Sequence, residues 1–137
     1  MGIDRCSLVQ LPVVADPQGN LAFAEAERHV PFPVARVYYV YDIPATARRG
    51  GHAHRKLEQV VFCLSGAMEM AVDDGGSRRT FRLDDPSVGL YLPPLVWQDI
   101  GAFVEGTVYM VLASARFDES EYIRDYEQYL AEARASA

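Results

Sequence analysis

The residues best suited to chemistry lie in one short stretch of the chain, residues 49–54, which read RGGHAH. In a β-strand, residues two positions apart point to the same face. His52 and His54 would therefore enter one pocket, with Arg49 at its edge. Such a pair of imidazoles can bind a metal ion or transfer protons. The side chains that accompany the two histidines decide between these two chemistries.

Proton transfer is the natural use of the pair if no metal is bound. An unperturbed histidine has a pKa near 6.5, so either imidazole could exchange a proton at neutral pH. A proton next to a carbonyl group would be a suitable substrate, and the enolate formed would need donors to hold its charge. Trp97 could equally be a core residue or a platform for stacking, whereas a tyrosine such as Tyr38 or Tyr39 is more often a core residue. The candidate donors are Arg49, Tyr38, Tyr39, Gln59 and Gln98.

The elements that would position these residues are short strands separated by turns. The predicted strands, besides the histidine segment, are 8–14, 21–25, 35–41, 60–64, 67–72, 79–83, 88–92 and 106–113. Many short strands at near-regular spacing indicate a sandwich or barrel. We expect an all-β single domain over residues 1–137, with the barrel at about 7–115.

The end of the chain breaks this pattern and predicts a helix. Asp118 offers an N-cap with a glutamate three residues later. Apolar positions then recur at helical spacing, at Ile123, Tyr126, Leu130 and Ala133. We expect a C-terminal α-helix at about 119–134, packed on the barrel.

Composition limits the function classes. The 137 residues carry a net charge of −6, so no broad nucleic-acid binding is expected, and an anionic ligand would be met by local basic residues. No signal-peptide pattern and no apolar run of the ~18 residues needed for a membrane span is present, which predicts a cytoplasmic protein without a membrane segment. Cys6 and Cys63 are expected to be buried reduced thiols.

A β-barrel with His-x-His on one strand resembles the cupin superfamily, or jelly-roll barrel. In that pattern a carboxylate follows the first motif, and a third histidine follows a proline-containing turn. Here Gln59 and Gln98 stand at those two positions, while Glu58 is expected to face the other side of its strand. A neutral amide is a poor ligand for a first-row transition ion. We therefore expect no metal and no cofactor.

The chain as a whole resembles the sugar-nucleotide 3,4-ketoisomerases, the WxcM-like cupins, over roughly residues 7–130. No one motif is decisive, but their order and spacing are specific. The matching segments are 16–21 (DPQGNL), 36–39 (RVYY), 49–54 (RGGHAH), 57–60 (LEQV), 88–91 (VGLY), 96–97 (VW), 111–114 (VLAS) and 118–124 (DESEYIR).

The resemblance implies a metal-independent homodimer that moves the keto group of dTDP-4-dehydro-6-deoxyglucose from C4 to C3. This step leads to 3-amino-3,6-dideoxy sugars. His54 would be the base at C3 and C4, and His52 would assist by moving a proton between the two oxygens. Tyr39 and Arg49 would line the sugar pocket. Many relatives carry histidine where this chain has Gln98, which leaves the C4 configuration of the product open.

Three rival functions remain at this stage. A dTDP-sugar 3,5-epimerase also uses a histidine base beside a 4-ketone, but pairs it with an aspartate that has no evident counterpart here. A non-catalytic cupin that binds a sugar nucleotide would need no acid–base pair. A metal-dependent dioxygenase is disfavoured by the two glutamines.

Overall fold

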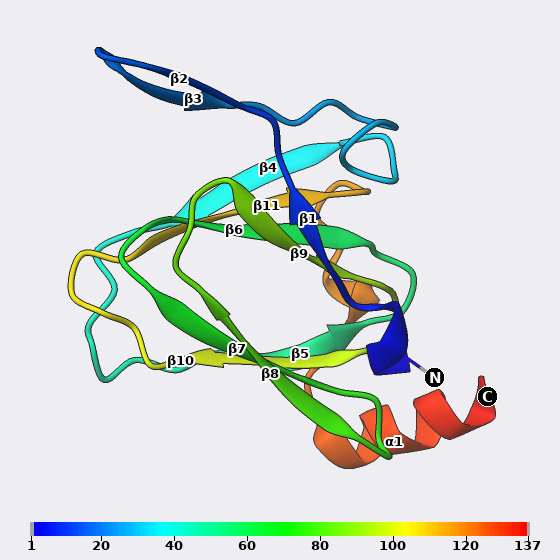
Figure 1. The fold of residues 1–137 in the computed structure, drawn as a ribbon. Coiled ribbons are helices and arrows are strands. Elements are labelled where there is room, and N and C mark those ends of the chain that lie inside the picture. The colour runs from blue at the N-terminus through cyan, green and yellow to red at the C-terminus, as the bar shows by residue number, and fades with distance from the viewer. Residues whose placement is uncertain (1, 137) are drawn as a thin grey trace.

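Two antiparallel five-stranded sheets face each other and form a barrel in the computed structural model, which describes residues 2–136 (Figure 1). The first sheet has the order β1 (Ser7–Gln10), β9 (Val88–Leu92), β6 (Gln59–Ser65), β11 (Val108–Ala113) and β4 (Arg36–Val40). The second has the order β12 (Tyr122–Ile123), β5 (Arg49–His54), β10 (Trp97–Gly101), β7 (Met68–Asp73) and β8 (Arg78–Leu83). The expected all-β barrel is confirmed.

The core lies between the two sheets and is formed by the inward-facing residues of alternating strand positions. Strands β6 and β9 of the first sheet and β7 of the second contribute to it through residues such as Val61, Leu90 and Met70. Cys6 and Cys63 are both buried free thiols. Burial raises the pKa of the Cys6 thiol to about 11, so this side chain packs as a small apolar group.

A hairpin of β2 (Val13–Asp16) and β3 (Gly19–Ala22) projects from the barrel as an arm (Figure 1). All eight of its residues are exposed, including the apolar Val13, Val14 and Leu21. The predicted strand at 8–14 is thus two strands, of which only β1 joins the barrel. A short 3-10 helix, η1 (Gly2–Arg5), precedes β1.

The expected helix at 119–134 is wrong in its first half. Asp118 caps only a 3-10 turn, η2 (Glu119–Glu121), and the chain then pairs with β5 as β12. The α-helix α1 (Tyr126–Ala135) begins after Asp125, whose carboxylate accepts a hydrogen bond from the Gln128 backbone amide at 3.1 Å. Hydrogen bonding to β5 outweighs the local helical pattern at residues 122–123.

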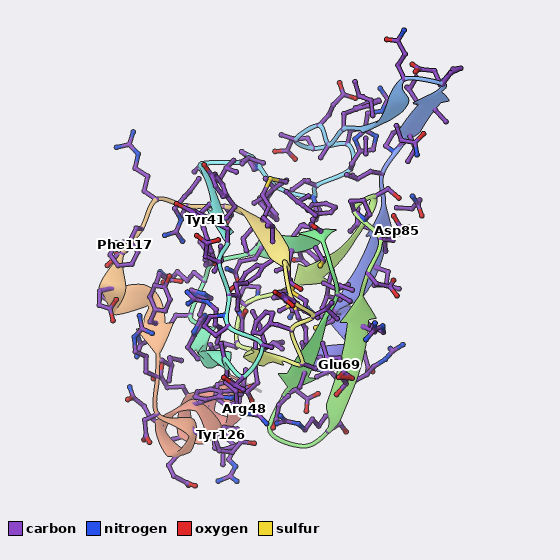
Figure 2. All side chains as sticks on the ribbon, turned by 90° about the vertical axis from the view of Figure 1, so that its left-hand side faces the viewer. Tyr41, Arg48, Glu69, Asp85, Phe117 and Tyr126 are labelled. Atoms are coloured by element: carbon purple, nitrogen blue, oxygen red, sulfur yellow. The ribbon has the colours of Figure 1, made fainter. Side chains whose placement is uncertain are left out.

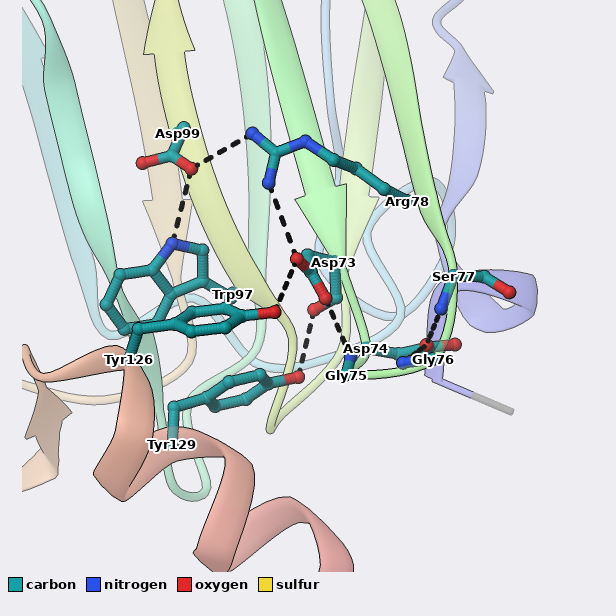
Figure 3. Close-up of polar contacts among 10 residues, drawn as sticks. All are labelled: Asp73, Asp74, Gly75, Gly76, Ser77, Arg78, Trp97, Asp99, Tyr126 and Tyr129. Atoms are coloured by element: carbon teal, nitrogen blue, oxygen red, sulfur yellow. Dashed lines mark hydrogen bonds and ion pairs between the residues drawn. The ribbon is translucent and has the colours of Figure 1, made fainter.

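The helix is fixed to the second sheet by tyrosine hydroxyls (Figure 3). The hydroxyl of Tyr129, a fully buried residue, shares its single proton between the backbone carbonyls of Asp73 and Leu95, whose oxygens lie 2.9 Å away each. Tyr126 donates to the Asp73 carboxylate at 2.8 Å, and Arg78 bridges the carboxylates of Asp73 and Asp99. Within residues 2–136, no helix is long and apolar enough to cross a membrane.

Candidate active site

A cavity of about 500 Å³ opens between the two sheets, on the inner faces of β4, β5, β10 and β11. Phe117, labelled in Figure 2, belongs to the segment that closes one side of it. The lining residues are Arg36, Tyr38, Arg48, Arg49, Gly50, His52, Val61, Gln98, Ile100, Tyr109, Val111, Phe117, Tyr122 and Arg124.

The cavity is positively charged although the chain is acidic. Its lining includes four arginines, Arg36, Arg48, Arg49 and Arg124, and no carboxylate among residues 2–136. Arginine binds phosphate oxygens through a planar fork of donors. The local charge therefore suits an anionic ligand, as the sequence predicted.

Glycines let β5 approach β10 closely where the histidines begin. Gly50 and Gly51 have φ of 79° and 69°, in the left-handed region that favours glycine. A Cβ atom at Gly50 would lie 2.7 Å from the Gln98 carbonyl oxygen, so a larger residue would push the strands apart. The register of the two strands shifts at this point, and Gln98 lies opposite His52.

The two histidines share a face of β5, as predicted, but lie at different depths. His52 lines the cavity, whereas His54 is only 3% exposed and does not. Their ring centroids are 5.0 Å apart. Neither ring nitrogen of His54 has a hydrogen-bond partner among the described residues, and the same holds for Nδ1 of His52.

Both imidazoles are held in the neutral form. Burial lowers the pKa of His54 to about 3, and the charges of His52, Arg36 and Arg124 act in the same direction. Burial likewise lowers the pKa of His52, with smaller opposing effects from the Gly50 carbonyl and the Asp99 carboxylate. At neutral pH both rings can therefore accept a proton, and His52 is the one that a ligand can reach.

Two buried amides, of which Gln98 lines the cavity and Gln59 does not, form a hydrogen-bonded chain that ends at Tyr38. Gln98 Nε2 donates to Gln59 Oε1 at 2.9 Å, and Gln59 Nε2 donates to the Tyr38 hydroxyl at 3.2 Å. Glu58 points the other way and accepts a hydrogen bond from Tyr91 at 2.7 Å, in agreement with the expected register. Among the described residues, no three His, Cys, Asp or Glu side chains are grouped so as to hold a metal ion.

Tyr38 and Arg49 lie where the sequence placed them, in the cavity wall. Arg49 Nε donates to the Tyr109 hydroxyl at 3.0 Å. The guanidinium of Arg36 lies 5.4 Å from the centroid of the Tyr38 ring, a cation–π distance. These contacts hold the two arginines in the cavity wall.

Three predicted substrate-binding residues do not line the cavity, namely Tyr39, Trp97 and Gln59, of which Gln59 reaches it only through its hydrogen bonds to Gln98 and Tyr38. Tyr39 is 63% exposed on the outer face of β4, because neighbouring residues of a strand alternate between faces. Trp97, next to Gln98 in β10, likewise faces away from the cavity and packs edge-to-face on Tyr126 at 5.2 Å. Its Nε1 donates to Asp99 at 3.2 Å (Figure 3), so Trp97 is core rather than a stacking platform.

Several lining residues were missed by sequence reasoning. Arg36 could have been found, since it lies two positions before Tyr38 on the same strand face. Tyr109 lies on β11, an otherwise apolar strand whose residues do not indicate which of them faces a ligand. Tyr122 and Arg124 belong to the segment 118–124, which was assigned to a helix. The missed residues are Arg36, Arg48, Tyr109, Phe117, Tyr122 and Arg124.

Comparison with known proteins gives consistent matches. Residues 4–134 match the protein family described as FdtA, WxcM-like, C-terminal. The chain is 41% identical over 122 residues to the TDP-4-oxo-6-deoxy-alpha-D-glucose-3,4-oxoisomerase of Aneurinibacillus thermoaerophilus, covering 89% of this chain and 88% of that protein.

Solved structures agree with this result. The 3,4-ketoisomerase QdtA from Thermoanaerobacterium thermosaccharolyticum, in complex with TDP, superposes with a TM-score of 0.93 at 40% identity, covering 96% of each chain. A histidine-to-asparagine variant of QdtA in complex with TDP-4-keto-6-deoxyglucose gives a TM-score of 0.93 at 39% identity, covering 95% of this chain and 94% of that one.

Proposed function

We propose that this chain, which belongs to the FdtA, WxcM-like family, is a sugar-nucleotide 3,4-ketoisomerase. Its substrate would be dTDP-4-dehydro-6-deoxyglucose. The enzyme class is that of its relatives, which are 3,4-ketoisomerases. The observation that carries the proposal is a neutral imidazole, His52, exposed to an arginine-lined cavity. This combination suits removal of a proton from a carbon next to a ketone in an anionic substrate.

The reaction needs only proton transfers. A base takes the proton from C3, the electron pair forms a C3–C4 double bond, and the C4 carbonyl oxygen becomes an enolate that is protonated to an enediol. The hydroxyl on C3 then loses its proton and becomes the ketone, while C4 takes a proton. Nothing is oxidised or reduced overall, so no external oxidant or reductant is consumed.

We propose that His52 is the base that contacts the substrate, in place of the role first expected for His54. His52 lines the cavity, and His54 lies behind it with its ring 5.0 Å away. Tyr38 suits the role of a donor to the enolate oxygen. Its hydroxyl oxygen already accepts a hydrogen bond from Gln59, which leaves its own proton free to donate towards the cavity.

The arginines of the cavity would hold the diphosphate of the substrate. Arg36, Arg48, Arg49 and Arg124 line the cavity, and a guanidinium can bind phosphate oxygens through its fork of donors; the fork of Arg124 is paired with Glu119 in this structure. Gln98 lies opposite His52 across β5 and β10 and lines the same cavity. It is therefore placed to influence the face on which C4 is protonated.

A homodimer and a cytoplasmic location complete the proposal. The arm of β2 and β3 exposes Val13, Val14 and Leu21, and the edge strand β4 exposes Val37 and Tyr39. Apolar surface of this extent on an arm and a free sheet edge suits contact with a second copy. Light scattering after size exclusion would test the dimer, with Val14→Asp expected to weaken it. The two free thiols suit a reducing compartment.

Proton NMR of dTDP-4-dehydro-6-deoxyglucose incubated with the protein in deuterated buffer tests the function. A new 3-keto species carrying deuterium at C4 is the expected result, and it also gives the C4 configuration. Deuterium at C3 and C5 without migration of the keto group would instead indicate an epimerase. No change in the sugar, with TDP still bound, would indicate a binding protein.

A further inference from the structure

Tyr122 reaches the two histidines through the pairing of β12 with β5. In this antiparallel pair Tyr122 lies directly opposite His54, and His52 is the diagonal neighbour on the same face. The ring centroid of Tyr122 is 4.4 Å from that of His54 and 5.1 Å from that of His52. The ring of Tyr122 thus contacts both imidazoles from the neighbouring strand β12.

The backbone at Tyr122 is held from several sides. The Glu121 carboxylate accepts hydrogen bonds from the backbone amides of Lys56 at 2.7 Å and Leu57 at 2.9 Å. Arg55 donates to the Tyr122 carbonyl at 3.3 Å and forms an ion pair with Glu132 of α1 at 2.9 Å. These contacts tie the segment to the residues that follow β5, so the ring keeps its place over the histidines.

The charged groups around the histidines come from four elements. They include Arg36 on β4, Arg49 at the start of β5, and Arg124 directly after β12, which is paired with Glu119 at 2.9 Å. The guanidinium of Arg124 stacks 4.4 Å from the Tyr122 ring centroid. Asp99 of β10 is the carboxylate that acts on His52 from the second sheet. The surroundings are basic on balance, and Tyr38 adds a neutral hydroxyl.

We infer that Tyr122 is a positioning residue, whose ring shields both imidazoles from water and keeps His52 a neutral base that faces the cavity. The inference rests on the proposed function for its role in turnover. Tyr122 itself need not exchange a proton. Its effect would come from the apolar ring, which removes water from one side of both histidines and so disfavours their charged forms.

Histidine NMR titration of three variants tests this inference. Tyr122→Leu should raise the pKa of His52 and His54 towards 6.5, by about 1 unit or more, because water then reaches the rings. Tyr122→Phe keeps the ring and should leave both values unchanged. Tyr126→Leu makes the same substitution in α1, against Trp97 rather than the histidines, and controls for loosening of the fold. Thermal melting of each variant verifies that it is folded.

Two results would overturn the inference: unchanged histidine pKa values in Tyr122→Leu, or an equal rise in Tyr122→Phe or Tyr126→Leu. In turnover, the acidic limb of the kcat/KM profile should move upward in pH with the histidine values in Tyr122→Leu only. The titration needs no substrate, so it measures the effect of Tyr122 on the histidine pKa values even if the wild-type protein does not convert the sugar. Failure of the proposed function would appear separately, as absent turnover in the wild type.

Discussion

Gln98→Leu and Gln59→Leu both break the hydrogen bond between the two buried glutamines, but they should lower the free energy of unfolding by different amounts. Gln59 is 2% exposed and does not line the cavity, whereas Gln98 is 4% exposed and does. Gln98→Leu leaves the Gln59 oxygen buried without a donor, at a cost of about 2 kcal/mol in the free energy of unfolding. Gln59→Leu leaves the Gln98 amide at the cavity wall, where water can pair with it, and should cost about 1 kcal/mol.

The double variant should lose no more than about 1 kcal/mol in the free energy of unfolding, because removing both partners leaves neither amide unpaired. The singles would sum to about 3 kcal/mol, so the expected coupling is about 2 kcal/mol. Urea unfolding of the four proteins at pH 7.5 measures it, with Gln18→Leu as a control at an exposed glutamine. Additivity within about 0.5 kcal/mol, or a larger loss in Gln59→Leu than in Gln98→Leu, would refute the assigned hydrogen bond and its geometry.

Three further outcomes are expected. His52→Asn should lower kcat at least ~10²-fold while calorimetry finds TDP affinity retained, and a near-normal kcat would remove His52 as the base. The folded-state pKa of His54, about 3, lies below the unfolded value of 6.5, so the unfolded chain alone gains this proton as pH falls. This group should therefore lower the free energy of unfolding, measured with urea, by about 1.4 kcal/mol between pH 7.5 and pH 5.5. The decrease over the same pH range should be smaller in His54→Asn. Tyr129→Phe removes the one hydroxyl proton that two buried carbonyls share and leaves both without this donor. Calorimetry should find a loss of about 2 kcal/mol in the free energy of unfolding and a Tm lower by about 7 °C; an unchanged Tm would contradict the importance of this contact.

Strand periodicity and turn residues predicted most of the barrel, and the His-x-His spacing predicted the strand face at the centre of the site. The strand β10 was missed because its sequence, WQDIG, mixes polar and apolar residues without a clear alternation. The sequence does not indicate which of Tyr38 and Tyr39 faces the cavity, since both faces of β4 carry apolar residues. Only the position of β4 at the edge of the first sheet exposes one face and turns the other into the cavity.

The largest error concerns the segment that carries Tyr122. Asp118 and the spacing of Ile123, Tyr126 and Leu130 are sound local signals for a helix. The backbone of residues 122–123 instead pairs with β5, about 70 residues earlier in the chain, and no local pattern reports such a partner. Local and tertiary preferences disagree at the point where the site is completed, which is where such disagreement is expected.

Strand β12 also determines when this protein can become active during its synthesis. It is the outermost strand of the second sheet and covers the edge of β5, which carries both histidines. A nascent chain that ends before residue 117 contains every strand except β12, and it lacks the cavity wall made by Phe117, Tyr122 and Arg124. The uncovered edge of β5 is then free to pair with other chains. Completion of the active site and protection against self-association therefore depend on the same few late residues.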